Sequence, residues 1–281
     1  MISTAPSISI LYGERQCDDH LVVDLHERQA RHLEAVAAWA ERIRTKLGPV
    51  LETHAGKVHF RPGSTGVAMV GLLPDRPQRG KSGLRDLARV AKEFDALFAR
   101  HCRDVDQGRV TGEKALQSFL IAEAYSSGRR LESINLASKA TEAPVELVFI
   151  TDEVPVPVAD GKIVCDLLAL RRDGGRSTPV LLELKDSRML TRLVEQVEGY
   201  STLMNEHAES FEKLYAAVLG EPVTFDGPTE EWIVWPAAGD GTDPREAELA
   251  SRGIRVVGYT EAGGERYEFR VGAGVQSQHL G

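Results

Sequence analysis

Long apolar runs, paired cysteines and an excess of positive charge are all missing from this sequence. Nowhere do roughly 18 uncharged apolar residues follow one another, so no membrane-spanning helix is expected. The first residues lack the basic segment and the apolar core of a signal peptide. The 3 cysteines, Cys17, Cys102 and Cys165, lie far apart and form no CxxC pair, which argues against a disulfide scaffold and a zinc ribbon. This cysteine usage predicts a reduced, cytoplasmic location.

The charge balance excludes one class of nucleic-acid-binding protein. The formal net charge is −8, from 34 Lys and Arg against 42 Asp and Glu. Such a chain does not coat nucleic acid through bulk positive charge, but it can still be an enzyme that contacts a phosphodiester locally. Basic residues gather over residues 76–100, where 7 Lys and Arg stand against 3 acids. We interpret this stretch as a solvated helix face, with a track for the DNA backbone as the alternative.

The length of 281 residues predicts two domains, because a domain averages about 150 residues. The pattern changes near residue 105, which divides the chain into an N-terminal α+β region (1–104), whose role is left open, and a second domain (105–281). Periodicity and turn residues predict the elements of the N-terminal region. They are short strands at 7–12 and 21–25, a helix at 26–47, a hairpin of strands 57–60 and 67–73, and a helix at 84–102.

The second domain is predicted to have an α/β fold, with one mixed sheet flanked by helices. Its expected elements, in order, are a helix at 112–124, strands at 131–136, 145–150, 162–171 and 179–185, a helix at 188–219 broken near His207, a strand at 231–235, a helix at 244–252 and a strand at 254–259.

Two of the expected strands carry charge within apolar segments. Asp166 lies in KIVCDLLAL, and Glu183 and Lys185 lie in PVLLELK. Side chains two residues apart on a strand share a face, so Glu183 and Lys185 project together. Asp166 precedes Glu183 by 17 residues, a spacing that lets a hairpin bring both carboxylates side by side. Buried carboxylates need a partner, and two of them with open positions suit Mg²⁺ or Mn²⁺.

The neighbouring helices add polar groups. Gln196 and Tyr200 are four residues apart, and therefore lie on one face of the helix that follows the second charged strand. Glu113 begins the helix ahead of the strands, and Gln117 shares its face. Glu113 is therefore a candidate third carboxylate.

Together these residues resemble the PD-(D/E)XK nuclease superfamily. The resemblance rests on Asp166, on Glu183-Leu184-Lys185, on the QxxxY element of Gln196 and Tyr200, and on the ExxxQ element of Glu113 and Gln117. The QxxxY helix is similar to that of the RecB-like and Mrr-like branches. The resemblance covers residues 105–260 and implies a restriction-endonuclease-like core. Cys165 stands before Asp166, where the superfamily name places proline.

The resemblance implies a Mg²⁺-dependent or Mn²⁺-dependent nuclease that hydrolyses DNA, in restriction, repair or anti-phage defence; RNA is the less favoured substrate. The implied metal ligands are Asp166, Glu183, the Leu184 carbonyl and Glu113. The implied catalytic residues are the three acids together with Lys185, which would position the attacking water, and Gln196 and Tyr200, which would order the site. Glu123 competes with Glu113 as the helical acid, and Glu153 is a further candidate.

Two other functions stay open from the sequence. A protein with the nuclease fold but without turnover could bind nucleic acid or a partner in a regulatory role. The helices of the N-terminal region could instead drive assembly, which would make the protein a homo-oligomer.

Overall fold

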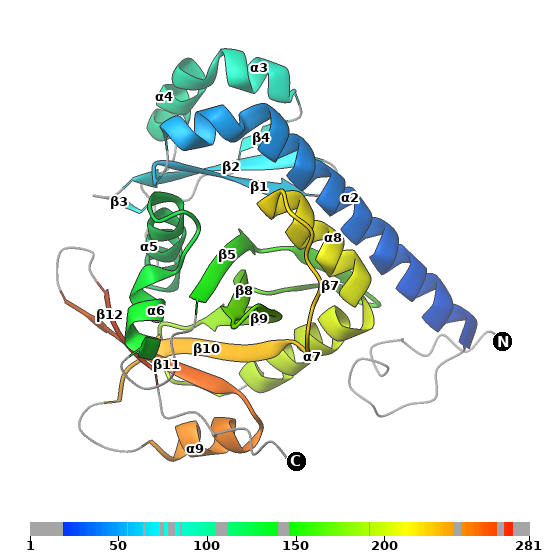
Figure 1. Cartoon of the computed structure of the whole chain (residues 1–281), viewed down its shortest axis with the longest axis vertical. Helices are drawn as coiled ribbons and strands as arrows, with labels where there is room; N and C mark the ends of the chain where they lie inside the picture. The colour runs from blue at the N-terminus through cyan, green and yellow to red at the C-terminus, as the bar shows by residue number, and fades with distance from the viewer. Residues whose placement is uncertain are drawn as a thin grey trace.

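The computed structural model describes residues 19–54, 56–63, 66–73, 76–77, 82–84, 86–104, 112–139, 146–190, 192–238, 243–262 and 267–271. The fold is α/β, with a mixed, curled sheet of six strands and helices packed on both faces (Figure 1). No helix in this described part of the chain combines the length and the apolar composition needed to cross a membrane.

The described residues of the N-terminal region form one long helix, a small antiparallel sheet and two short helices. In order these are α2 (Asp19–Thr53), β1 (Val58–Gly63), β2 (Gly66–Leu73), β3 (Arg76–Pro77), β4 (Ser82–Leu84), α3 (Leu87–Lys92) and α4 (Phe94–Asp104). β1 and β2 pair as an antiparallel hairpin, as the sequence predicted. Apolar side chains of α2, α3 and α4 pack in one cluster with side chains of this hairpin.

The remaining elements build the six-stranded sheet and its cover. They are α5 (Gly112–Ser126), α6 (Glu132–Lys139), β5 (Glu146–Asp152), β6 (Pro155–Val158), β7 (Gly161–Val164), β8 (Leu167–Asp173), β9 (Arg176–Leu184), α7 (Leu193–Glu206), α8 (Ala208–Leu219), β10 (Glu230–Pro236), α9 (Pro244–Ser251), β11 (Arg255–Glu261) and β12 (Tyr267–Val271). The strand order is β12-β11-β10-β9-β8-β5. β5, β8 and β9 run antiparallel, whereas β10 is parallel to both β9 and β11.

Alternation along the strands creates two hydrophobic cores, one on each face of the sheet. In β9, Leu182 and Leu184 face the core beneath α5, whereas Leu181 faces the core beneath α7 and α8. Both faces are buried, which explains why the central strands read as nearly continuous apolar runs. A charged residue in such a strand needs a specific partner, and Glu183 is the acid that β9 buries.

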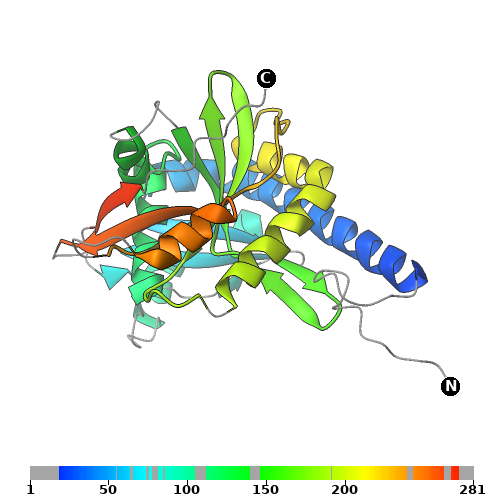
Figure 2. The ribbon, with the colours of Figure 1, turned by 90° about the horizontal axis from the view of Figure 1, so that it is seen from below.

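The long helix α2 joins the N-terminal region to the sheet. Its residues Leu33, Val36 and Ala40 are buried in the same core as α7 and α8. Figures 1 and 2 both show α2 lying along α8. Gln29 of α2 also donates to the Pro157 carbonyl of β6, at 2.9 Å. The N-terminal region therefore shares a hydrophobic core with the sheet.

Several predicted elements need correction. The strand predicted at 21–25 was wrong, because these residues are helical in α2. The surrounding helix overrides the local preference of Val22 and Val23 for a strand. Residues 131–136 were predicted as a strand, but α6 begins at Glu132, and its buried residues recur at helical spacing. The strand predicted at 7–12 lies outside the described residues.

Two further elements are divided in the structure. The strand predicted over 162–171 is broken at Cys165 and Asp166, because β7 pairs with β6 in a separate ribbon whereas β8 joins the main sheet. The helix predicted over 84–102 consists of α3 and α4, which meet at Glu93. The break near His207 that separates α7 from α8 was predicted correctly.

Candidate active site

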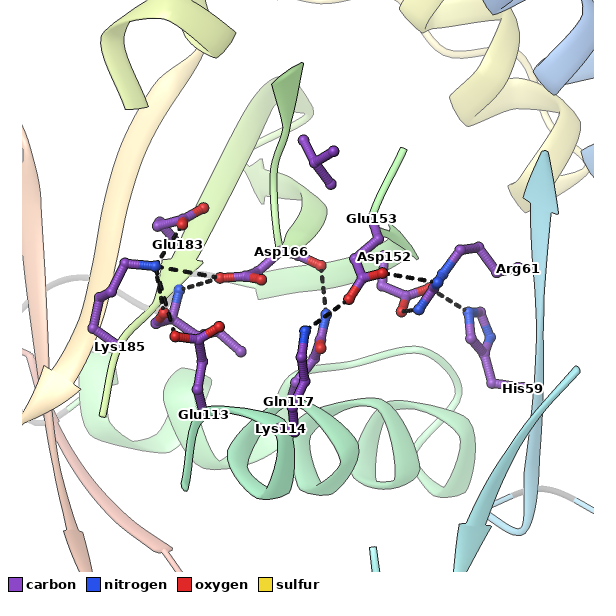
Figure 3. A network of polar contacts seen from close by, with 12 residues as sticks. His59, Arg61, Glu113, Lys114, Gln117, Asp152, Glu153, Asp166, Glu183 and Lys185 are labelled. Carbon is purple, nitrogen blue, oxygen red and sulfur yellow. Dashed lines mark hydrogen bonds and ion pairs between the residues drawn. The ribbon is translucent and has the colours of Figure 1, made fainter. Parts of the chain in front are cut away.

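Three carboxylates converge on the ammonium group of Lys185 (Figure 3). The Lys185 Nζ lies 2.6 Å from the Glu183 Oε1 and 2.9 Å from the Leu184 carbonyl oxygen. It also lies 3.8 Å from the Glu113 Oε2 and 4.0 Å from the Asp166 Oδ2. One cation position is therefore surrounded by oxygens from α5, from the break between β7 and β8, and from the end of β9.

Asp166 is held at both its side chain and its main chain. The Leu184 N–H donates to the Asp166 Oδ2 at 2.9 Å, which directs the carboxylate towards the end of β9. The carbonyl oxygen of Asp166 accepts from the Gln117 Nε2 at 2.9 Å and from the Glu153 N–H at 3.2 Å. Gln117 thus connects α5, which also carries Glu113, to the segment that carries Asp166.

Glu183 is held by the helix that follows β9. The Gln196 Nε2 donates to the Glu183 Oε1 at 2.7 Å, and it also lies 3.2 Å from the Val164 carbonyl oxygen. Tyr200 is buried one turn further along α7, and its hydroxyl donates to the Val154 carbonyl oxygen at 3.0 Å. The structure therefore brings Gln196 to the acids, whereas the Tyr200 hydroxyl contacts the main chain after β5.

Burial and neighbouring charges change the pKa of Asp166, Glu183 and Lys185. Loss of water raises the pKa of Asp166 to about 6 and, reinforced by the charge of Asp166, raises the pKa of Glu183 to about 7. Burial opposes the charge on Lys185, but attraction from Glu183, Asp166 and Glu113 outweighs it and raises the pKa of the ammonium. Asp166 and Glu183 therefore hold their protons more tightly than exposed acids do, and their protonation can change near neutral pH when a cation approaches.

The other two candidate acids lie elsewhere. The Glu123 Oε1 accepts from the Ser133 N–H at 3.1 Å and from the Ser133 hydroxyl, so Glu123 links α5 to α6. Glu153 pairs with Lys114 at 3.0 Å and with Arg61 at 2.9 Å. Of the helical acids, Glu113 is the one within 4 Å of the Lys185 ammonium.

The oxygen donors around Lys185 fit a divalent cation, subject to one rearrangement. Carboxylate and carbonyl oxygens are the ligands that Mg²⁺ and Mn²⁺ prefer. Within the described residues, no three His, Cys, Asp or Glu side chains form a ready metal-holding group. The ammonium of Lys185 lies where the oxygens of Glu113, Asp166, Glu183 and the Leu184 carbonyl meet. A metal ion at this position therefore requires the Lys185 side chain to withdraw from Glu183.

A second polar cluster, which the sequence analysis missed, lies beside these acids. Asp152, at the end of β5, is fully buried and accepts from the Arg61 Nε at 2.9 Å. The His59 Nε2 lies 2.8 Å from the Asp152 Oδ1. Burial opposes ionisation of Asp152, yet Arg61 and His59 hold its pKa well below the usual range. The sequence did contain a signal of the kind that pointed to Glu183, namely charged or polar residues within an apolar strand. In β1 these residues are His59 and Arg61.

Comparisons of this chain with protein-family models, with curated proteins and with solved structures found no match. Its function therefore has to be argued from the site itself.

Proposed function

We propose that the chain is a metal-dependent phosphodiesterase that hydrolyses DNA, built on a PD-(D/E)XK nuclease core. The observation that carries the proposal is the convergence of Glu113, Asp166, Glu183 and the Leu184 carbonyl oxygen on the one position that the Lys185 ammonium now occupies. A buried cluster of acids costs stability, and such a cost is typical of functional sites.

The order of the elements supports the restriction-endonuclease-like assignment. Helix α5 precedes three antiparallel strands, β5, β8 and β9, and α7 and α8 then lead into β10, which is parallel to β9. The three acids lie at the start of α5, immediately before β8 and near the end of β9. Because β10 and β11 extend the sheet beyond β9, the acids lie near the middle of the sheet rather than at its edge.

Each residue of the site has its own part in the proposed hydrolysis. Asp166, Glu183 and Glu113 supply anionic oxygens, and the Leu184 carbonyl supplies a neutral one. A bound Mg²⁺ or Mn²⁺ ion supplies Lewis-acid polarisation of the phosphodiester and lowers the pKa of water. Lys185, once withdrawn from Glu183, positions the attacking water and balances the negative charge that develops on the phosphate.

A substrate panel tests this function. Purified wild type, Glu183→Ala and the control Glu123→Ala are incubated with linear duplex DNA, supercoiled plasmid, single-stranded DNA and RNA, with Mg²⁺, Mn²⁺ or EDTA. We expect metal-dependent cleavage of a DNA substrate by wild type and by Glu123→Ala, but none by Glu183→Ala. Cleavage that persists in Glu183→Ala or in EDTA contradicts the assignment.

The pairing of Lys185 with Glu183 also favours a second candidate, a binding protein that keeps the fold without turnover. In that protein the ammonium would stay in the cation position permanently. Titration calorimetry with Mn²⁺ separates the two, because the inactive protein would bind DNA but show no saturable binding of the metal.

A further inference from the structure

We propose that Glu153, whose side chain is held by Arg61 of the N-terminal hairpin and by Lys114 of α5, is a positioning residue for Asp166. The inference rests on the proposed function, since it assigns the N-terminal region a part in ordering that site. Figure 3 shows the chain of contacts from β1, through the end of β5, to the acids around Lys185.

The first link is the backbone of Glu153. Its φ is 42°, a left-handed conformation that residues with a Cβ atom rarely adopt. In this conformation the Glu153 N–H points at the Asp166 carbonyl oxygen, at 3.2 Å. A strained backbone persists when its surroundings hold it in place, and it is more common at functional sites than elsewhere.

The second link is the pair of cations that hold the Glu153 side chain. The Arg61 Nη1 lies 2.9 Å from the Glu153 Oε2, and the Lys114 Nζ lies 3.0 Å from the Oε1. Arg61 also forms two hydrogen bonds to Asp152, so its planar guanidinium bridges two consecutive acids. The Arg61 side chain is 8% exposed, and the bridge is therefore shielded from water and salt.

The third link reaches the candidate metal ligands. The Asp166 carbonyl is held from one side by the Glu153 N–H and from the other by Gln117 of α5. Lys114 and Glu113 are adjacent on that same helix. The Arg61–Glu153–Lys114 bridge therefore sets the position of Asp166 relative to Glu113. β1 contributes to the site without touching the reacting atoms.

Substitutions at Glu153 separate positioning from simple stabilisation. Glu153→Ala removes both ion pairs but keeps the Cβ atom, so the left-handed backbone stays unfavourable and loses the two ion pairs that help to hold it. Glu153→Gly also removes both pairs, but glycine adopts a positive φ readily. Arg61 keeps Asp152 as its partner in both variants, so we expect both to fold. The matched control is Glu230→Ala, because Arg171 similarly bridges two acids, Asp173 and Glu230.

Amide hydrogen exchange at Leu184 supplies the readout, because that N–H donates to the Asp166 carboxylate itself. In the metal-free protein we expect exchange at Leu184 to be about tenfold faster in Glu153→Ala. Glu153→Gly should lie between Glu153→Ala and wild type, and Glu230→Ala should match wild type. If Glu153→Ala does not fold, Glu153→Gln, which keeps the shape and loses the charge, takes its place in the comparison.

Unchanged exchange at Leu184 in Glu153→Ala overturns the proposal, and equal exchange in the Ala and Gly variants overturns the role of backbone strain. Cleavage kinetics supply the second readout. We expect the kcat of Glu153→Ala to fall by roughly tenfold to a hundredfold with an unchanged KM for DNA. If wild type cleaves nothing, the proposed function fails, but the exchange result at Leu184 still decides the positioning role.

Discussion

Replacing Glu183 with glutamine should make the protein more stable at alkaline pH. Burial raises the pKa of Glu183 from 4.5 to about 7, so the folded state binds a proton more tightly than the unfolded state does. Folding stability is therefore lost as the pH rises between these two values. Glutamine resembles the protonated acid, and its amide oxygen can still accept from Gln196 and Lys185.

The size of the gain follows from the shift in pKa. A shift of about 2.5 units corresponds to about 3 kcal/mol at pH 8, where the folded acid is ionised. At pH 5 the same calculation leaves less than about 1 kcal/mol, because the acid is largely protonated in the folded state. For a chain of this size the gain at pH 8 raises Tm by roughly 6–10 °C.

Urea unfolding in EDTA at pH 8 and pH 5 measures both free energies. The control Glu198→Gln changes a half-exposed acid on the same helix as Gln196 and should stay within about 0.5 kcal/mol of wild type at either pH. The reasoning is refuted if Glu183→Gln is no more stable than wild type at pH 8, or if its advantage does not shrink at pH 5.

Three further predictions concern residues around the site. Lys185→Met should retain or tighten Mn²⁺ binding in calorimetry, because it clears the cation position, while cleavage falls by roughly 10²–10⁴-fold; weakened metal binding would contradict this. Asp152→Asn should cost about 3–5 kcal/mol at pH 7, because it leaves Arg61 with a weaker buried partner. Since the folded-state pKa of Asp152 is lowered, this difference in urea stability should shrink as the pH falls below about 4, and a constant difference would count against it. Tyr200→Phe should cost about 1 kcal/mol of stability through the lost bond to Val154 and leave cleavage within about twofold of wild type; a large loss of activity would instead place the hydroxyl in the chemistry.

The sequence was informative about the candidate site wherever a charge interrupts an apolar strand. Strand alternation and the spacing between Asp166 and Glu183 were enough to predict that these acids and Lys185 lie together. Choosing between Glu113 and Glu123 required the tertiary structure, because both lie on α5 and one of them links that helix to α6.

Contacts between residues far apart in the sequence could not be predicted from the sequence patterns. The bond between Arg61 and Asp152 joins residues 91 positions apart, and neither residue belongs to a recognisable motif. The break at Cys165 and Asp166 was equally hidden, because the segment reads as one apolar strand until pairing divides it between two sheets. Pairing and tertiary packing decide such details, whereas periodicity reports the type of each element.

A cleavage assay on duplex DNA with Mg²⁺ tests the central claim most directly. It compares wild type, Asp166→Asn and Glu198→Gln side by side. The account predicts cleavage by wild type and by Glu198→Gln, none by Asp166→Asn, and none by any of them in EDTA. Circular dichroism is used to check that all three proteins are folded before their rates are compared. Wild-type rates in folded Asp166→Asn, or cleavage that does not depend on a metal, would contradict the claim that the acids around Lys185 form a metal-dependent phosphodiesterase site.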